Sequence, residues 1–264
     1  MILLLNTCEQ IPPMGGYVDR SKSNRFSYGI FKNSIYYKSG SPVTDIKGIF
    51  GIPTYSRLKG ANVASFEVIS WGIGKDKNTV YVGNEKQPHV DAATFHINSD
   101  GVACDNKSVF CGSYLHIIDE ADPQSFEVIK GDYIWQWARD KNNYYYKYYH
   151  DCFNADVDYN TFQLINYSFA WDKNYLYTGN IATKELIKTK ANPGGYTPVT
   201  KYYIHDDQNI YFCRYIYDRE SSLVTIPLKD PESVQPFINT EEDDKDNFIV
   251  ANNTIYYFGE LFIK

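Results

Sequence analysis

The sequence predicts an all-β protein built from repeats, and three observations support this fold class. The 264 residues include 25 Tyr and 15 Phe but only 2 Met, and aromatic residues suit the half-buried surface of a pleated sheet better than a helix. Runs of the helix-favouring residues Ala, Leu and Glu are scarce. Two short elements also alternate along the chain at a nearly constant spacing, which is typical of a repeat architecture.

The first repeated element is a polar turn followed by an aliphatic–aromatic pair. Asp and Asn side chains accept hydrogen bonds from the backbone N–H groups just ahead of them, so the triplet Asp-Lys-Asn predicts a hairpin loop. The Val-Tyr, Ile-Tyr or Leu-Tyr pair that follows starts an outgoing strand. The seven copies begin at Lys32, Asp76, Asp105, Asp140, Asp172, Asp207 and Asn252.

The second element, Asp-x-x-Ser/Thr-Phe or a looser form of it, lies between these turns. It predicts another polar turn, whose aromatic residue enters the core at the start of a strand. In three of the six copies, 14 residues separate the leading Asp or Asn from the next turn aspartate, as between Asn62 and Asp76, and in a fourth, from Asn192 to Asp207, the separation is 15. The predicted strands alternate apolar and polar residues as one-sided strands do; they are Phe66–Ile69, Phe95–Ile97, Phe126–Ile129 and Phe162–Ile165.

The repeats fill residues 26–264, which predicts a single β-repeat domain behind an N-terminal segment of residues 1–25. One unit cannot bury its apolar face alone, so neighbouring units must stack. Seven copies with three or four short strands each favour a compact seven-bladed β-propeller, because ring closure removes exposed sheet edges. The repeats are shorter than usual blades, so an open β-solenoid of stacked hairpins stays the alternative.

The acidic charge argues against a general nucleic-acid-binding protein, which needs a basic surface. The formal net charge is −6 and the isoelectric point is near 5.4. This charge either keeps the protein soluble or attracts a basic partner. Glu241 and Asp243 lie in the densest acidic run, which is either a solvated loop or a contact for that partner.

The first eight residues resemble the end of a bacterial lipoprotein signal, in which the cysteine is acylated after cleavage. No basic residue precedes the apolar run, and Asn6-Thr7 stands where small residues are usual before Cys8. Two interpretations stay open. Residues 1–25 are the remnant of a lipoprotein signal with Cys8 as the lipidation site, which predicts a periplasmic protein, or they begin with a buried strand, which fits a cytoplasmic one.

Two further cysteines, Cys104 and Cys111, flank the turn at residues 105–108. A disulfide across this hairpin is one prediction, and buried free thiols are the other.

Motifs of enzymes, cofactors and metals are missing from the sequence, which predicts a protein that is not an enzyme and needs neither cofactor nor metal. Gly-x-Ser-x-Gly and phosphate-binding glycine loops do not occur. Calcium loops place carboxylates at alternate positions, whereas here a Lys separates Asp from Asn, so the triplets indicate turns. The five histidines form no helical metal pair.

The aromatic stretch from residue 135 to residue 150 is the best candidate for a binding segment. Tyr offers a large rigid surface and a hydroxyl group, which suits binding. The alternative is a buried strand with Tyr at its rim and Trp in the core. The candidate residues are Trp135, Trp137, Tyr144, Tyr146 and Tyr148.

The turns at residues 76–81, 140–146 and 172–177 resemble the motif of the bacterial DKNYY family, whose members repeat it beside an Asp-x-x-Ser/Thr-Phe element. The resemblance covers most of the chain. It implies an exported or lipid-anchored protein, and some family members look like immunity proteins paired with secreted toxins. It carries over no catalytic residue, because the shared motif is a turn.

Together these observations predict an immunity protein that binds and occludes a cognate protein toxin, with a basic surface on the toxin as the expected complement. The alternative is a lipid-anchored envelope protein that binds a glycan or another envelope component. A third hypothesis is an enzyme with its active site in the central channel of a propeller. No nucleic-acid partner is expected, and contact with a membrane only through a lipid anchor.

Overall fold

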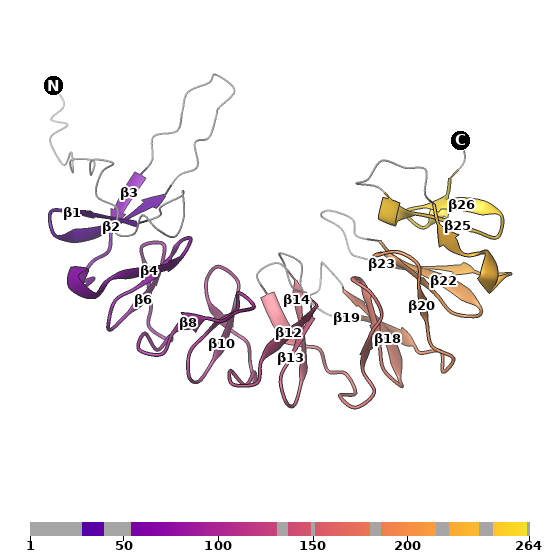
Figure 1. Cartoon of the computed structure of the whole chain (residues 1–264), viewed down its shortest axis with the longest axis horizontal. Helices are drawn as coiled ribbons and strands as arrows, with labels where there is room; N and C mark the ends of the chain where they lie inside the picture. The colour runs from indigo at the N-terminus through magenta and orange to yellow at the C-terminus, as the bar shows by residue number, and fades with distance from the viewer. Residues whose placement is uncertain are drawn as a thin grey trace, which may run out of the picture. The chain divides into compact units, whose positions relative to one another are not determined.

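The computed structural model describes residues 28–39, 54–130, 137–148, 151–179, 186–214, 222–237 and 245–262 (Figure 1). These residues form β-strands joined by turns and three short 3-10 helices, and none of them lies in an α-helix. The chain divides into two compact units, Met1–Ile117 and Ile118–Lys264. The prediction of an all-β repeat protein is confirmed.

The first unit contains three antiparallel sheets whose strands are hydrogen-bonded in chain order. Its only 3-10 helix in the described ranges is η1 (Val63–Ser65). The sheets are β1 (Tyr28–Phe31), β2 (Ser34–Ser39) and β3 (Thr54–Arg57); β4 (Glu67–Ser70), β5 (Ile73–Lys75), β6 (Val80–Val82) and β7 (Glu85–Gln87); and β8 (His96–Ile97), β9 (Ala103–Cys104), β10 (Val109–Cys111) and β11 (His116–Ile117).

The second unit contains four sheets of the same kind, with η2 (Pro231–Ser233) and η3 (Lys245–Asn247). The sheets are β12 (Glu127–Lys130), β13 (Trp137–Arg139), β14 (Tyr144–Tyr148) and β15 (Asp151–Asn154); β16 (Gln163–Leu164), β17 (Phe169–Trp171), β18 (Tyr175–Gly179) and β19 (Leu186–Lys190); β20 (Thr197–Pro198), β21 (Tyr203–His205), β22 (Asn209–Arg214) and β23 (Ser222–Pro227); and β24 (Gln235–Pro236), β25 (Phe248–Ala251), β26 (Thr254–Tyr257) and β27 (Glu260–Leu261).

The two sequence elements mark fixed positions in each sheet. The aromatic residue of the second element stands directly before the first strand, as predicted, and Phe66, Phe95, Phe126 and Phe162 are all buried. The first element forms the hairpin between the second and third strands of a four-stranded sheet. The sheet β1–β3 has only three strands in the described residues, and it belongs to the copy in which the second element is missing from the sequence. Four antiparallel strands in chain order are the form of a propeller blade; closure of the blades into a ring stays a prediction.

Sheets within a unit stack face to face, so successive residues of one strand are buried in different clusters. In β21, Tyr203 packs with Ile249 of the following sheet. Its neighbour Ile204 packs with Phe169 and Leu176 of the preceding sheet. Both are 0 % exposed, because alternate side chains of a strand point to opposite faces and each face here is covered.

Two buried tyrosines tie one sheet to the next through backbone groups of its turns. In the first unit, the Tyr28 hydroxyl lies 2.8 Å from the carbonyl oxygens of both Gly72 and Gly83, which belong to the turns of sheet β4–β7. In the second unit, the Tyr203 hydroxyl accepts from the Gly259 N–H at 2.7 Å and donates to the Asn247 carbonyl at 3.3 Å. Each tyrosine is the first residue of its strand, Tyr28 of β1 and Tyr203 of β21.

Candidate functional site

The aspartate that opens each polar turn is a shared acceptor, and Asp172 shows the arrangement. Its Oδ1 accepts from the backbone N–H groups of Asn174 and Tyr175 at 2.7 and 2.9 Å. Its Oδ2 accepts from the Asp158 backbone N–H and from the Tyr177 hydroxyl, both at 2.7 Å. One carboxylate therefore closes its own turn, holds the second polar turn and orients the motif tyrosine. We call this arrangement the aspartate clamp.

The turn-closing part of the clamp occurs in five of the seven sheets within the described residues, and the bond to the second polar turn in four of these, since the Asn192 N–H donates to the Tyr196 hydroxyl and not to Asp206. Each of these aspartates is buried, with 1–6 % of its surface exposed. Each accepts from the backbone N–H groups two and three residues ahead. The tyrosine hydroxyl joins in four of them, and Phe110 takes its place beside Asp105. The clamp aspartates are Asp76, Asp105, Asp140, Asp172 and Asp206.

In the sixth copy the clamp residue is Asp206, one position before the aspartate that the sequence pattern indicated. Asp206 accepts from the N–H groups of Gln208 and Asn209 and from the Tyr211 hydroxyl. The neighbouring Asp207 instead accepts from the Asn192 side-chain amide at 2.7 Å. Counting from Asp206 restores the regular interval of 14 residues to Asn192.

Hydrogen bonds lower the pKa of three of the buried clamp carboxylates, those of Asp140, Asp172 and Asp206. Burial alone would raise the pKa of Asp140, but the N–H groups of Asp122, Asn142 and Asn143 and the Tyr145 hydroxyl outweigh it and hold the pKa below its usual value. The pKa values of Asp172 and Asp206 are lowered by the same kinds of contact against the same cost. Burial, and then the adjacent carboxylate, raises the pKa of the Tyr177 hydroxyl, which stays a donor.

The Ser or Thr of the second element and the Lys of the first add a further connection. The Thr161 hydroxyl accepts from the Lys173 backbone N–H at 3.2 Å, and Ser125 and Lys141 repeat this contact at 3.2 Å. The Lys141 ammonium also lies 2.6 Å from an oxygen of Asp122, and this contact, followed by that of Ser125, lowers the pKa of Asp122 to about 2. The polar residues of both repeated elements thus join two turns of one sheet.

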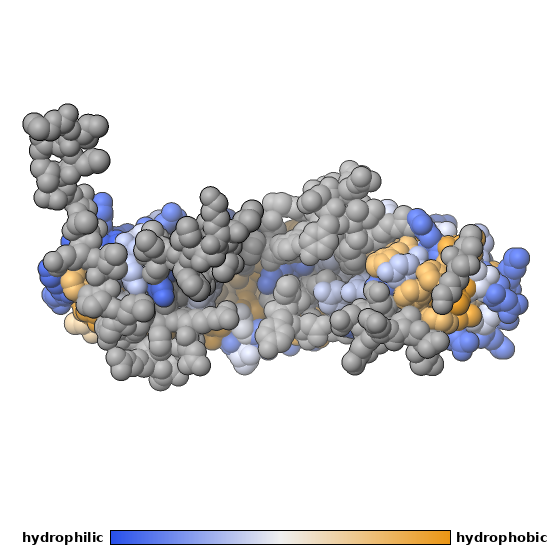
Figure 2. All heavy atoms as spheres, turned by 90° about the horizontal axis from the view of Figure 1, so that it is seen from above, coloured by the Kyte–Doolittle hydropathy of each residue, from blue (hydrophilic) through white to orange (hydrophobic). Residues whose placement is uncertain are grey.

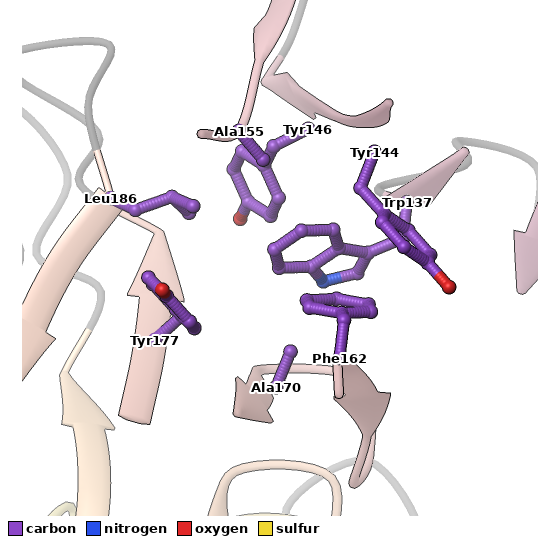
Figure 3. Packing of buried hydrophobic residues seen from close by; sticks show 8 residues of the cluster. All are labelled: Trp137, Tyr144, Tyr146, Ala155, Phe162, Ala170, Tyr177 and Leu186. Atoms are coloured by element: carbon purple, nitrogen blue, oxygen red, sulfur yellow. The ribbon is translucent and has the colours of Figure 1, made fainter. Parts of the chain in front are cut away.

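The central residues of the predicted binding segment lie in the core. Trp137 and Tyr146 are each 1 % exposed and Tyr144 is 9 % exposed. The Trp137 ring packs against Tyr146 and Phe162, with ring centroids 5.0 and 4.9 Å apart (Figure 3). This corrects the prediction that these three side chains form a binding surface, because stacking of the sheets buries the face that carries them.

Several predicted residues lie outside the part of the chain that the structure describes. They are Trp135, Glu241, Asp243, Cys8 and the segment 1–25. The backbone of Tyr148 belongs to β14, and its side chain is not among the described ones. The predictions for these residues stay predictions.

The predicted disulfide between Cys104 and Cys111 does not form. Cys104 is a buried free thiol, and Cys111 is disulfide-bonded to a different cysteine. In the register of this hairpin Cys104 lies opposite Val109, two residues before Cys111. Such diagonal pairs are about 7–8 Å apart, which is too far for a disulfide without backbone movement.

The Cys104 thiol lies next to a histidine. Its sulfur is 3.3 Å from His96 Nε2. The other ring nitrogen, Nδ1, lies 2.9 Å from the Thr94 carbonyl oxygen, so it donates there and leaves Nε2 as the acceptor for the thiol. Burial and, after it, the Asp105 carboxylate raise the pKa of Cys104. The thiol is therefore neutral and covered, which is a poor arrangement for a nucleophile.

The exposed aromatic residues of the first unit stand in turns at the ends of strands. Trp71 lies between β4 and β5 and is 73 % exposed, and Tyr114 lies between β10 and β11 and is 60 % exposed. The Tyr28 hydroxyl bonds the carbonyl of Gly72, the residue after Trp71, which fixes that turn. By sequence, Trp71 stands five residues before clamp residue Asp76, and Trp135 stands five residues before Asp140. The two residues therefore hold the same place in the repeated sequence.

Within the described ranges no three His, Cys, Asp or Glu side chains are grouped as a metal site would require. Those ranges also hold no helix of the length and apolarity needed to cross a membrane.

Comparison with known proteins gave one match. Residues 21–149 match the family model described as the DKNYY family. No curated protein and no solved structure matches the chain.

Proposed function

We propose that this chain, whose residues 21–149 belong to the DKNYY family, is a non-enzymatic binding protein, and specifically an immunity protein that neutralises a cognate toxin by occluding it. The observation that carries the proposal is that the motif residues hydrogen-bond to one another within the fold. The carboxylate oxygens of the clamp aspartates accept hydrogen bonds from backbone N–H groups and Tyr hydroxyls of the same sheet. The motif residues therefore support the fold as a scaffold. The side chains that this scaffold presents outward include exposed aromatics such as Trp71, which stands beside the hydrogen-bonded Gly72.

The acidic charge supports a basic partner. With a net charge of −6, the protein would attract a toxin that carries a basic surface, and the attraction would speed association. Glu241 and Asp243 are the proposed contributors, together with Trp135 from the aromatic segment.

Export to the periplasm, with Cys8 as a lipid anchor, is part of the proposal. A structural disulfide persists in oxidising compartments and is rare in the cytosol. The disulfide-bonded state of Cys111 supports an exported protein for this reason.

The test is co-expression with the open reading frames that neighbour its gene, followed by affinity purification. The proposal predicts a stoichiometric complex with one of these products, which is toxic when expressed alone and harmless with this protein. Absence of both a complex and protection would exclude the immunity function.

A second candidate function is favoured by the same exposed rings. Trp71 and Tyr114, at 73 % and 60 % exposure, could stack on sugar rings, as an envelope protein that binds a glycan would need. Binding on a glycan array that is lost in Trp71→Ala, without any protein partner, would favour this function over immunity.

A further inference from the structure

We draw no further inference here: the strongest candidate, the apolar surface over the last two sheets, β20–β23 and β24–β27 (Figure 2), carries no proposal, because nothing in the part of the chain that the structure describes shows what covers it.

Discussion

Asp172 illustrates how one residue type serves several purposes in this protein. Its two oxygens collect four donors, from two turns and one tyrosine. A buried carboxylate is costly unless hydrogen bonds replace its water shell, and here they do. Three of the four donors come from fixed positions two, three and five residues after the aspartate, whereas the fourth comes from the second polar turn.

The tyrosine hydroxyl of the clamp should contribute measurably to the free energy of unfolding. Tyr177→Phe removes the 2.7 Å hydrogen bond to Asp172 and should lower the free energy of unfolding by about 1.5–3 kcal/mol, the range for a bond to a charged acceptor. Tyr175→Phe, two residues away on the same strand and 44 % exposed, is the control and should cost less than about 0.5 kcal/mol. Urea unfolding of both variants checks this; equal losses would show that the hydroxyl at residue 177 is not special.

Acid should destabilise the protein through the clamps. The pKa values of Asp140, Asp172 and Asp206 are lower in the fold than their usual value. Their stabilisation is complete above the unfolded pKa of about 4 and is lost as the pH falls from there through the folded pKa. Urea midpoints between pH 7 and pH 3 should fall below about pH 4, and less steeply in Asp172→Asn. A flat profile would mean that these carboxylates do not support the fold.

The number of residues between the two repeated elements corresponds to the length of one β-hairpin. The chain leaves Asp158, runs along β16, returns along β17 and reaches Asp172, which accepts the Asp158 N–H. Asp122 and Asp140 make the same contact at 2.8 Å although 18 residues separate them. The clamp contact is therefore kept when more residues separate the two elements.

The tyrosines that join one sheet to the next should stabilise the sheet that they contact. Tyr203→Phe leaves the Gly259 N–H without its acceptor, and an unsatisfied buried donor costs about 1–3 kcal/mol. The loss should be local: amide hydrogen exchange should speed up in β25–β27 and stay unchanged in β16–β18. Uniform acceleration in both sheets would instead show that the contact supports the whole unit.

Strands and turns could be predicted from the sequence, and the clamp could not. Local residue types identify a strand after Phe66 or Phe126 and a turn at Asp140. The bond from Asp122 to Asp140 depends on strand register, which no local pattern contains. Burial of Trp137, Tyr144 and Tyr146 was missed for a related reason: both faces of a stacked sheet are covered, so alternation along a strand does not tell an outward face from a buried one.

For the whole molecule, the structure separates residues that build the scaffold from residues available to a partner. The repeated motif belongs to the first group, because its Asp groups accept from the Tyr hydroxyls and its Ser or Thr hydroxyls accept from the Lys backbone N–H groups. Trp71 and Tyr114 belong to the second group, since they stand outside the motif and are exposed. Such a division allows contact residues to vary while the scaffold is retained.

The free energy of unfolding and the partner affinity of Asp172→Asn, measured side by side, test this division most directly. The amide would place a donor against the Asp158 N–H, so stability should fall by about 3 kcal/mol, while the folded protein should bind its partner with an unchanged dissociation constant. Asp119→Asn, at an exposed turn residue, is the control for both. Unchanged stability with a loss of binding would contradict the account and make the repeated aspartates the binding site.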